Sequence, residues 1–142
     1  MPMYICNASK GVIAEHVKSE LASDITRIHC EMTEAPPQFV HVVFFEEARN
    51  PPLSERKVAV ACNIRAGRTD AQKSEIITRI QQSLNARCGV QPDQTRITTS
   101  DTPANWVMEG GDIMPEPGDE ADWMVAHESK RTGEANPSAG GG

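Results

Sequence analysis

The chain repeats one order of structural elements twice, and this repeat constrains the fold more than any other feature. In the first half, residues 3–6 form a short apolar run that predicts a strand, and residues 9–33 predict a helix. Residues 38–46 are rich in Val and Phe and predict a second strand. The helix is indicated by apolar residues recurring at helical spacing: Ile13, Val17, Leu21, Ile25, Ile28 and Met32.

The same order returns in the second half of the chain. Residues 57–64 predict a strand, and residues 69–87 predict a helix with one apolar face. Thr69 and Gln72 fit a capping box, which fixes the start of this helix. Residues 95–99 predict the strand that returns to the sheet.

Two tandem β-α-β units, at 2–46 and 57–99, therefore account for most of the chain. A helical crossover between two strands favours parallel pairing within each unit. We expect an α/β (α+β) fold in which a four-stranded sheet carries two helices on one face. Because nothing in the sequence covers the other face, we expect several copies of the chain to associate over it.

Residues 101–127 differ from the two units in their sequence pattern, because prolines and glycines interrupt short apolar pairs. They predict loops with a short extra strand or hairpin, which could wrap a neighbouring subunit. Residues 128–142 are polar, end in Pro-Ser-Ala-Gly-Gly-Gly, and predict a disordered tail. The folded domain is therefore expected to span residues 1–127.

The composition excludes several classes of protein. Of 142 residues, 38% are apolar and 24% are charged, which is typical of a globular chain, and aromatic residues are only 4%. Acidic residues outnumber basic ones by 20 to 14, and the net charge of −6 argues against a nucleic-acid partner. No apolar run approaches the roughly 20 residues that cross a bilayer, so no membrane partner is expected.

Four cysteines are widely spaced along the chain, at Cys6, Cys30, Cys62 and Cys88. Zinc sites need clustered ligands, and small disulfide-stabilised proteins have denser cysteines. We therefore expect reduced, mostly buried thiols in a cytoplasmic protein, with no metal site and no disulfide.

Pro2 is the first residue that could carry chemistry. Methionine before a small residue is normally removed, and Pro2 would then expose a secondary amine. An α-amino group has a pKa of about 7.7–8.0 in water. Burial would make this amine a neutral base, whereas a nearby carboxylate would keep it a protonated acid. The strand that follows at once would hold the amine rigidly; the alternative is a proline that merely starts a strand.

Arg65 and Arg68 form a second candidate group, between a strand and a capped helix. Guanidinium groups bind carboxylates through two parallel hydrogen bonds, and a helix start adds backbone donors. Their alternative role is that of solvated loop residues.

Glu109 and His29 complete the candidates. Glu109 lies between an apolar run and a glycine pair, where a partly buried carboxylate with a shifted pKa can be held. His29 borders the apolar stripe of the first helix, where it could donate to a substrate oxygen or be purely structural. The other histidines, His16, His41 and His127, show no partner pattern in the sequence.

Taken together, these residues resemble the tautomerase superfamily, and more narrowly its cis-3-chloroacrylic acid dehalogenase group. The resemblance covers about residues 2–125 apart from a loop near 48–56. Its motifs are Pro2-Met-Tyr4, Asp24-Ile-Thr-Arg-Ile-His29, Arg65-Ala-Gly-Arg68-Thr-Asp-Ala-Gln-Lys73 and Met108-Glu109-Gly110-Gly111-Asp-Ile-Met-Pro-Glu-Pro-Gly118 with Trp123.

The resemblance implies two β-α-β units per subunit, a homotrimer, a small carboxylate substrate and no cofactor. It implies that protonated Pro2 gives its proton to the substrate carbon next to the carboxylate. Arg65 and Arg68 would bind and polarise that carboxylate. His29 would assist binding, and Glu109 would activate water for attack at the far carbon, after which the adduct loses halide.

One departure from the dehalogenase pattern concerns a catalytic tyrosine in the strand after the second helix. Here threonine stands in the matching place, in the region of Thr98, and the only tyrosine is Tyr4. We therefore expect weak or altered dehalogenase activity and a different physiological substrate.

Three functions remain open from the sequence. The first is hydration or dehalogenation of a small 2,3-unsaturated acid, with Pro2 as acid and Glu109 as base. The second is keto–enol tautomerisation of a 2-oxo acid such as phenylpyruvate, which needs Pro2 and an arginine only. The third is a non-catalytic oligomeric binding protein, which the joint presence of all the candidate residues disfavours.

Overall fold

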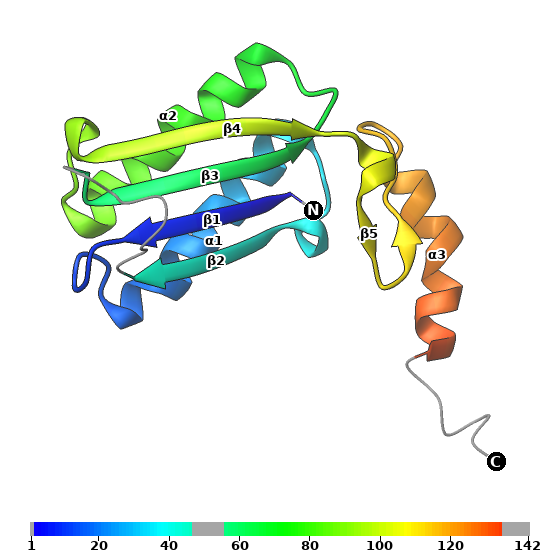
Figure 1. The fold of residues 1–142 in the computed structure, drawn as a ribbon. Coiled ribbons are helices and arrows are strands. Elements are labelled where there is room, and N and C mark those ends of the chain that lie inside the picture. The colour runs from blue at the N-terminus through cyan, green and yellow to red at the C-terminus, as the bar shows by residue number, and fades with distance from the viewer. Residues whose placement is uncertain (1, 47–55, 135–142) are drawn as a thin grey trace.

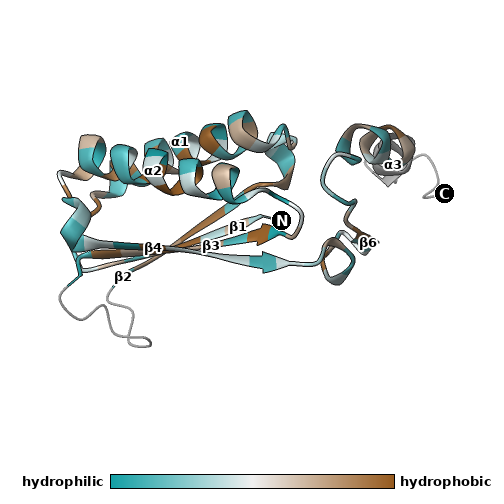
Figure 2. Ribbon diagram, turned by 90° about the horizontal axis from the view of Figure 1, so that it is seen from above, coloured by the Kyte–Doolittle hydropathy of each residue, from teal (hydrophilic) through white to brown (hydrophobic). Residues whose placement is uncertain are grey.

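A computed structural model describes residues 2–46 and 56–134 of the chain, without the side chains of 128–134 (Figure 1). The predicted fold is confirmed, because the two β-α-β units form one four-stranded sheet. Both long helices lie on the same face of that sheet (Figure 2).

The first unit follows from its hydrophobic pattern, but its helix is shorter than predicted. It begins at Glu15 rather than Ser9, because Gly11 adopts a left-handed backbone, φ 81°, that breaks regular structure. The helix ends where Glu34 turns left-handed ahead of Pro36. The elements are β1 (Met3–Ala8), α1 (Glu15–Thr33), a short 3₁₀ turn η1 (Pro37–Phe39) and β2 (His41–Glu46).

The second unit matches its prediction to within a few residues. The capping box is present: the Thr69 side chain accepts from the Gln72 backbone N–H, and the Gln72 side chain accepts from the Thr69 N–H. Gly89 closes the helix in the left-handed conformation. The elements are β3 (Val58–Arg65), α2 (Asp70–Cys88), a 3₁₀ turn η2 (Pro92–Gln94) and β4 (Thr95–Thr102).

The strand order is β2-β1-β3-β4. Pairing is parallel inside each unit, as predicted, and antiparallel where β1 meets β3 at the centre. In the central pairing Met3 lies opposite Asn63 and Ala8 lies opposite Val58. The starts of β1 and β2 therefore share one end of the sheet with the ends of β3 and β4 (Figure 1). Pro2 directly precedes β1 and Arg65 is the last residue of β3, so both fall at this end.

The core lies between the sheet and the two helices and is mainly aliphatic. Alternate residues of β1 and β3 point into it, together with the apolar stripes of α1 and α2. On the opposite sheet face, residues such as Ile5 and Val43 are partly exposed and Phe45 is 51% exposed. The residues that the structure describes in a single chain therefore leave that face uncovered.

The segment after β4 contains the predicted hairpin and a helix that was not predicted. It forms a 3₁₀ turn η3 (Ala104–Trp106), a hairpin of β5 (Met108–Glu109) and β6 (Asp112–Ile113), and α3 (Glu120–Glu134). The prediction of a disordered tail is therefore wrong for residues 128–134, which are helical. Residues 135–142 lie outside the described residues. None of the described helices is long and apolar enough to cross a membrane.

The cysteines are free thiols in the described structure. Cys6 and Cys62 are buried, and burial raises the pKa of each to about 12. Cys30 and Cys88 are only partly buried, so the expectation of burial holds for half of the set.

Candidate active site

Pro2 is buried at the entrance to β1. Its carbonyl oxygen accepts a hydrogen bond of 2.9 Å from the N–H of His41, the first residue of β2. Extending the β1–β3 register by one residue places Pro2 opposite Ile64 and next to Arg65. The backbone therefore holds Pro2 inside the fold, beside the end of β3.

Arg65 and Arg68 are brought together, as the sequence predicted, but not as solvated loop residues. Arg65 is 1% exposed; its guanidinium lies 5.4 Å from the centre of the Phe39 ring, and its Nη1 donates to the Pro115 carbonyl oxygen. Both arginines donate through Nη2 to one carboxylate oxygen of Glu120, at 2.8 and 2.7 Å. Glu120, the first residue of the unpredicted helix α3, was not among the candidate residues.

Arg68 also links the two β-α-β units, together with Gln72. Arg68 Nη1 donates to the carbonyl oxygen of Thr33, at the end of α1, at 3.1 Å. The side chain of Gln72 donates to the neighbouring carbonyl oxygen of Met32 at 2.9 Å. Two of the carbonyl groups that α1 leaves unpaired at its end are thus satisfied from the start of α2.

His29 is buried beside this cluster, with 1% of its surface exposed. Its Nδ1 lies 2.6 Å from the hydroxyl oxygen of Tyr4, which is also buried. Burial, with the charges of Arg68 and Arg65, lowers the pKa of His29 to about 3, so the ring is neutral at pH 7. Burial raises the pKa of Tyr4 above its ordinary value, so its hydroxyl keeps its proton.

The tautomer of His29 decides the direction of this hydrogen bond. In the tautomer whose proton resides on Nε2, the Tyr4 hydroxyl donates to Nδ1. Nε2 is buried and has no hydrogen-bond partner among the described residues. In this tautomer His29 presents a buried N–H donor. Tyr4 is a second residue whose place near the site the sequence did not reveal.

Glu109 is held at the same end of the sheet by His41. Its carboxylate oxygen lies 3.1 Å from His41 Nε2, and the carboxylate side chain is 21% exposed. We expected no partner for His41, and that expectation is wrong, as it is for His127, whose Nδ1 lies 2.8 Å from the Trp123 carbonyl oxygen. Because the His41 backbone also binds Pro2, Glu109 is connected to the amino-terminal residue through a single intermediary.

Thr98, the residue in place of the expected tyrosine, lies apart from this cluster. It is exposed in the middle of β4 and pairs with Ala61, on the sheet face that the helices do not cover. In one chain it therefore cannot complete the group around Pro2.

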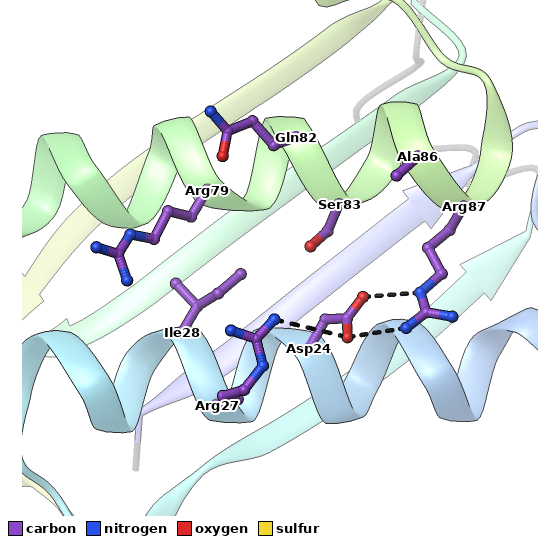
Figure 3. A pocket seen from close by; sticks show the side chains of 8 residues that line it. All are labelled: Asp24, Arg27, Ile28, Arg79, Gln82, Ser83, Ala86 and Arg87. Atoms are coloured by element: carbon purple, nitrogen blue, oxygen red, sulfur yellow. Dashed lines mark hydrogen bonds and ion pairs between the residues drawn. The ribbon is translucent and has the colours of Figure 1, made fainter.

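A pocket of about 450 Å³ between α1 and α2 is a separate feature (Figure 3). Asp24 binds Arg87 through two hydrogen bonds of 2.8 and 3.1 Å, and Arg27 lies 3.8 Å from the same carboxylate. Arg79 is paired with Glu31 and Glu75 in the same way. The charges that line this pocket are thus matched by neighbouring side chains, which fits a role in joining the two helices.

No group of His, Cys, Asp and Glu within the described residues could hold a metal ion. The groups that the chain itself brings to this end of the sheet are buried Pro2, two guanidinium groups, one neutral imidazole and a carboxylate.

Comparisons with known proteins identify the family and the fold. A tautomerase family model described as "Putative oxalocrotonate tautomerase enzyme" matches residues 1–130. Among curated proteins, none matches this sequence. The solved structure of N1, a member of the cis-3-chloroacrylic acid dehalogenase family, is 26% identical, with a TM-score of 0.79, over 87% of this chain and 91% of its own.

Two further solved structures are similar. Native Ps01740 is 32% identical, with a TM-score of 0.66, over 76% of this chain and all (100%) of its own. A fused 4-OT described as an asymmetric trimer is 24% identical over 79% of this chain and 95% of its own, and its TM-score of 0.68 shows a shared fold. The chain therefore belongs to this tautomerase family and is an enzyme of the tautomerase superfamily.

Proposed function

We propose that this enzyme uses the amine of Pro2, freed by removal of Met1, to hydrate or dehalogenate small 2,3-unsaturated carboxylates such as cis-3-haloacrylates. One observation carries the proposal: a single end of the sheet gathers buried Pro2, the arginine pair and His29, with Glu109 held beside β2. No cofactor is required, because these groups supply acid, base and charge stabilisation.

The substrate carboxylate binds to the arginine cluster. Arg68 Nε and His29 Nε2 are buried donors without a partner among the described residues, so they are available to carboxylate oxygens. Hydrogen bonds from charged donors are short and strong, and in a dry site they hold the substrate in one orientation.

The chemical step balances with water as the only co-reactant. Glu109 takes a proton from water, whose oxygen forms a bond to C3 while the C2–C3 π electrons move toward the carboxylate. The arginine pair stabilises this enediolate-like charge, and protonated Pro2 then gives its proton to C2. The C3 adduct carries hydroxyl and halogen; loss of halide and of the hydroxyl proton yields the aldehyde acid.

Tautomerisation of a 2-oxo acid is the second candidate, favoured by the description of the matching family as oxalocrotonate tautomerases. In this reaction neutral Pro2 takes the proton from the enol hydroxyl, the C=O bond forms as the C=C electrons move to C3, and Pro2 returns a proton to C3. Glu109 has no required role, so its substitution separates the two candidates.

We propose further that the chain acts as a homotrimer. Fused 4-OT structures of the same fold are described as trimers. The uncovered sheet face, with Phe45 exposed, is a suitable surface for such association. Thr98 lies on that face, so association would bring it toward a neighbouring chain.

The proposal is tested with a substrate panel of cis-3-haloacrylates and phenylenolpyruvate, on protein whose loss of Met1 is verified by mass spectrometry. Pro2→Ala should lower turnover of either class by roughly 10²–10⁴-fold. Pro92→Ala, at an exposed turn, is the matched control and should retain activity. Full activity in Pro2→Ala, or retention of Met1 in active protein, would refute the amine mechanism.

Glu109→Gln assigns the reaction class. It should reduce hydration strongly and leave tautomerisation nearly unchanged, because only hydration needs a base for water. Glu116→Gln removes an exposed carboxylate from the same segment and serves as its control. Equal losses in the two reactions would contradict the role assigned to Glu109.

A further inference from the structure

Glu120 is the most constrained carboxylate at this end of the molecule. The residue is 6% exposed, and one oxygen accepts from both Arg65 and Arg68. Its other oxygen accepts from the backbone N–H of Gly118 at 2.7 Å. Burial alone would raise the pKa of Glu120, but hydrogen bonds from its own backbone N–H, Arg68 and Gly118 outweigh burial and lower it.

The first consequence concerns charge. Two guanidinium groups and one carboxylate leave the cluster with a single positive charge, since the neighbouring His29 is neutral. In a buried place, where charges interact more strongly than in water, that single charge matches a ligand with one negative charge. A ligand with two carboxylates would bring one charge that the two arginines and Glu120 do not neutralise.

The second consequence concerns orientation. Each arginine is held at two points: Arg65 by Pro115 and Glu120, and Arg68 by Thr33 and Glu120. These contacts use Nη1 and Nη2 of Arg68 and leave its buried Nε without a partner among the described residues. Glu120 thereby fixes which edge of this guanidinium remains open.

We infer that Glu120 is a positioning residue that orients the arginine pair and, by cancelling one of its two charges, makes the site selective for monocarboxylates. This inference rests on the proposed function, in which the arginine pair binds the substrate carboxylate. The alternative role for Glu120 is that of an occupant: its carboxylate would fill the place of the substrate carboxylate and would have to move away before the substrate binds.

Titration calorimetry with acrylate, a monoanion, and fumarate, a dianion, tests the inference at about pH 8, where both acids are fully ionised. The wild-type protein should bind acrylate more tightly. Glu120→Gln keeps the shape but removes the charge, and should shift the affinity ratio toward fumarate by about tenfold. Asp122→Asn, an exposed acid in the same helix, is the matched control and should leave the ratio unchanged.

Each other outcome overturns the inference in a recognisable way. If Glu120→Gln binds both acids more tightly by the same factor, the carboxylate was an occupant of the site. If neither affinity moves, Glu120 is only structural. If the wild-type protein binds neither acid, the proposed carboxylate site itself fails, and the inference fails with it.

A second variant covers the case in which Glu120→Gln does not fold. Glu120→Asp keeps the negative charge with a shorter reach, so it should weaken binding of both acids and retain the preference for acrylate. A preference for fumarate in Glu120→Asp would contradict the charge argument.

Discussion

Neutral, buried His29 makes the stability of this protein depend on pH in a defined direction. The pKa of the ring is about 3 in the folded chain, because burial and the positive charges of Arg68 and Arg65 disfavour protonation. The negative charge of Glu120 raises the pKa, but by less than these causes lower it. In the unfolded chain the pKa returns to about 6.5. Between these values the unfolded state binds the extra proton, so stability is complete above pH 6.5 and falls as pH decreases.

The size of the effect follows from these two values. At pH 5 the unfolded histidine is almost fully protonated and folded His29 is almost fully neutral. Linkage then gives a loss of about 2 kcal/mol in the free energy of unfolding between pH 8 and pH 5 from this one residue.

Urea unfolding at pH 8 and pH 5, at one fixed chain concentration, measures this loss, since an oligomer's stability depends on concentration. The glutamine in His29→Gln does not titrate. Between pH 8 and pH 5 this variant should therefore lose about 2 kcal/mol less of its free energy of unfolding than the wild type loses. His16→Gln changes an exposed histidine of the same helix and should behave as wild type. The reasoning is refuted if wild type and His29→Gln lose the same stability.

Two further substitutions test local parts of the structure. Tyr4→Phe leaves the buried Nδ1 of His29 without its hydrogen-bond partner and should cost about 1–3 kcal/mol in urea unfolding at pH 8; an unchanged midpoint would show that this hydrogen bond is absent. Thr69→Ala removes the side-chain oxygen that caps α2 and should cost about 1 kcal/mol, whereas Thr69→Ser should remain near wild type; equal losses in both variants would contradict the capping role.

The two β-α-β units could be predicted because their patterns are local. The apolar stripe of α2 and its capping box lie within one stretch of sequence, and both are present in the structure. The start of α1 was placed too early because Ile13 continues the stripe into a turn, where the left-handed Gly11 breaks the helix. Hydrophobic spacing alone does not report backbone conformation.

The contacts of the site could be predicted only in part. Pro2, Arg65 and His29 stood out by their places along the chain, and the fold brings them to one end of the sheet. Glu120 did not, because it meets its arginines across 55 and 52 positions of the sequence. Such a pairing depends on where α3 docks, and no local pattern encodes it.

The helix α3 itself had a weak signal that was overlooked. Acidic residues occupy its first turn, which suits a helix start, and Trp123 is followed four residues later by His127, on which its ring stacks at 4.1 Å. The many breakers before Asp119 concealed this spacing. Trp123 also packs against Phe39, edge to face at 5.5 Å, so the helix is docked by tertiary contact.

The antiparallel pairing of β1 with β3 relates the two units by an approximate twofold axis, yet the two ends of the sheet are not equivalent. The first unit contributes Pro2 and His29 to one end, and the second contributes Arg65 and Arg68 to the same end. The opposite end, where β3 begins at Val58, follows a continuous chain and cannot offer a terminal amine. The two similar units thus contribute different residues to one site, and two halves of the chain cut between Glu46 and Arg56 would regain the complete group only when they associate.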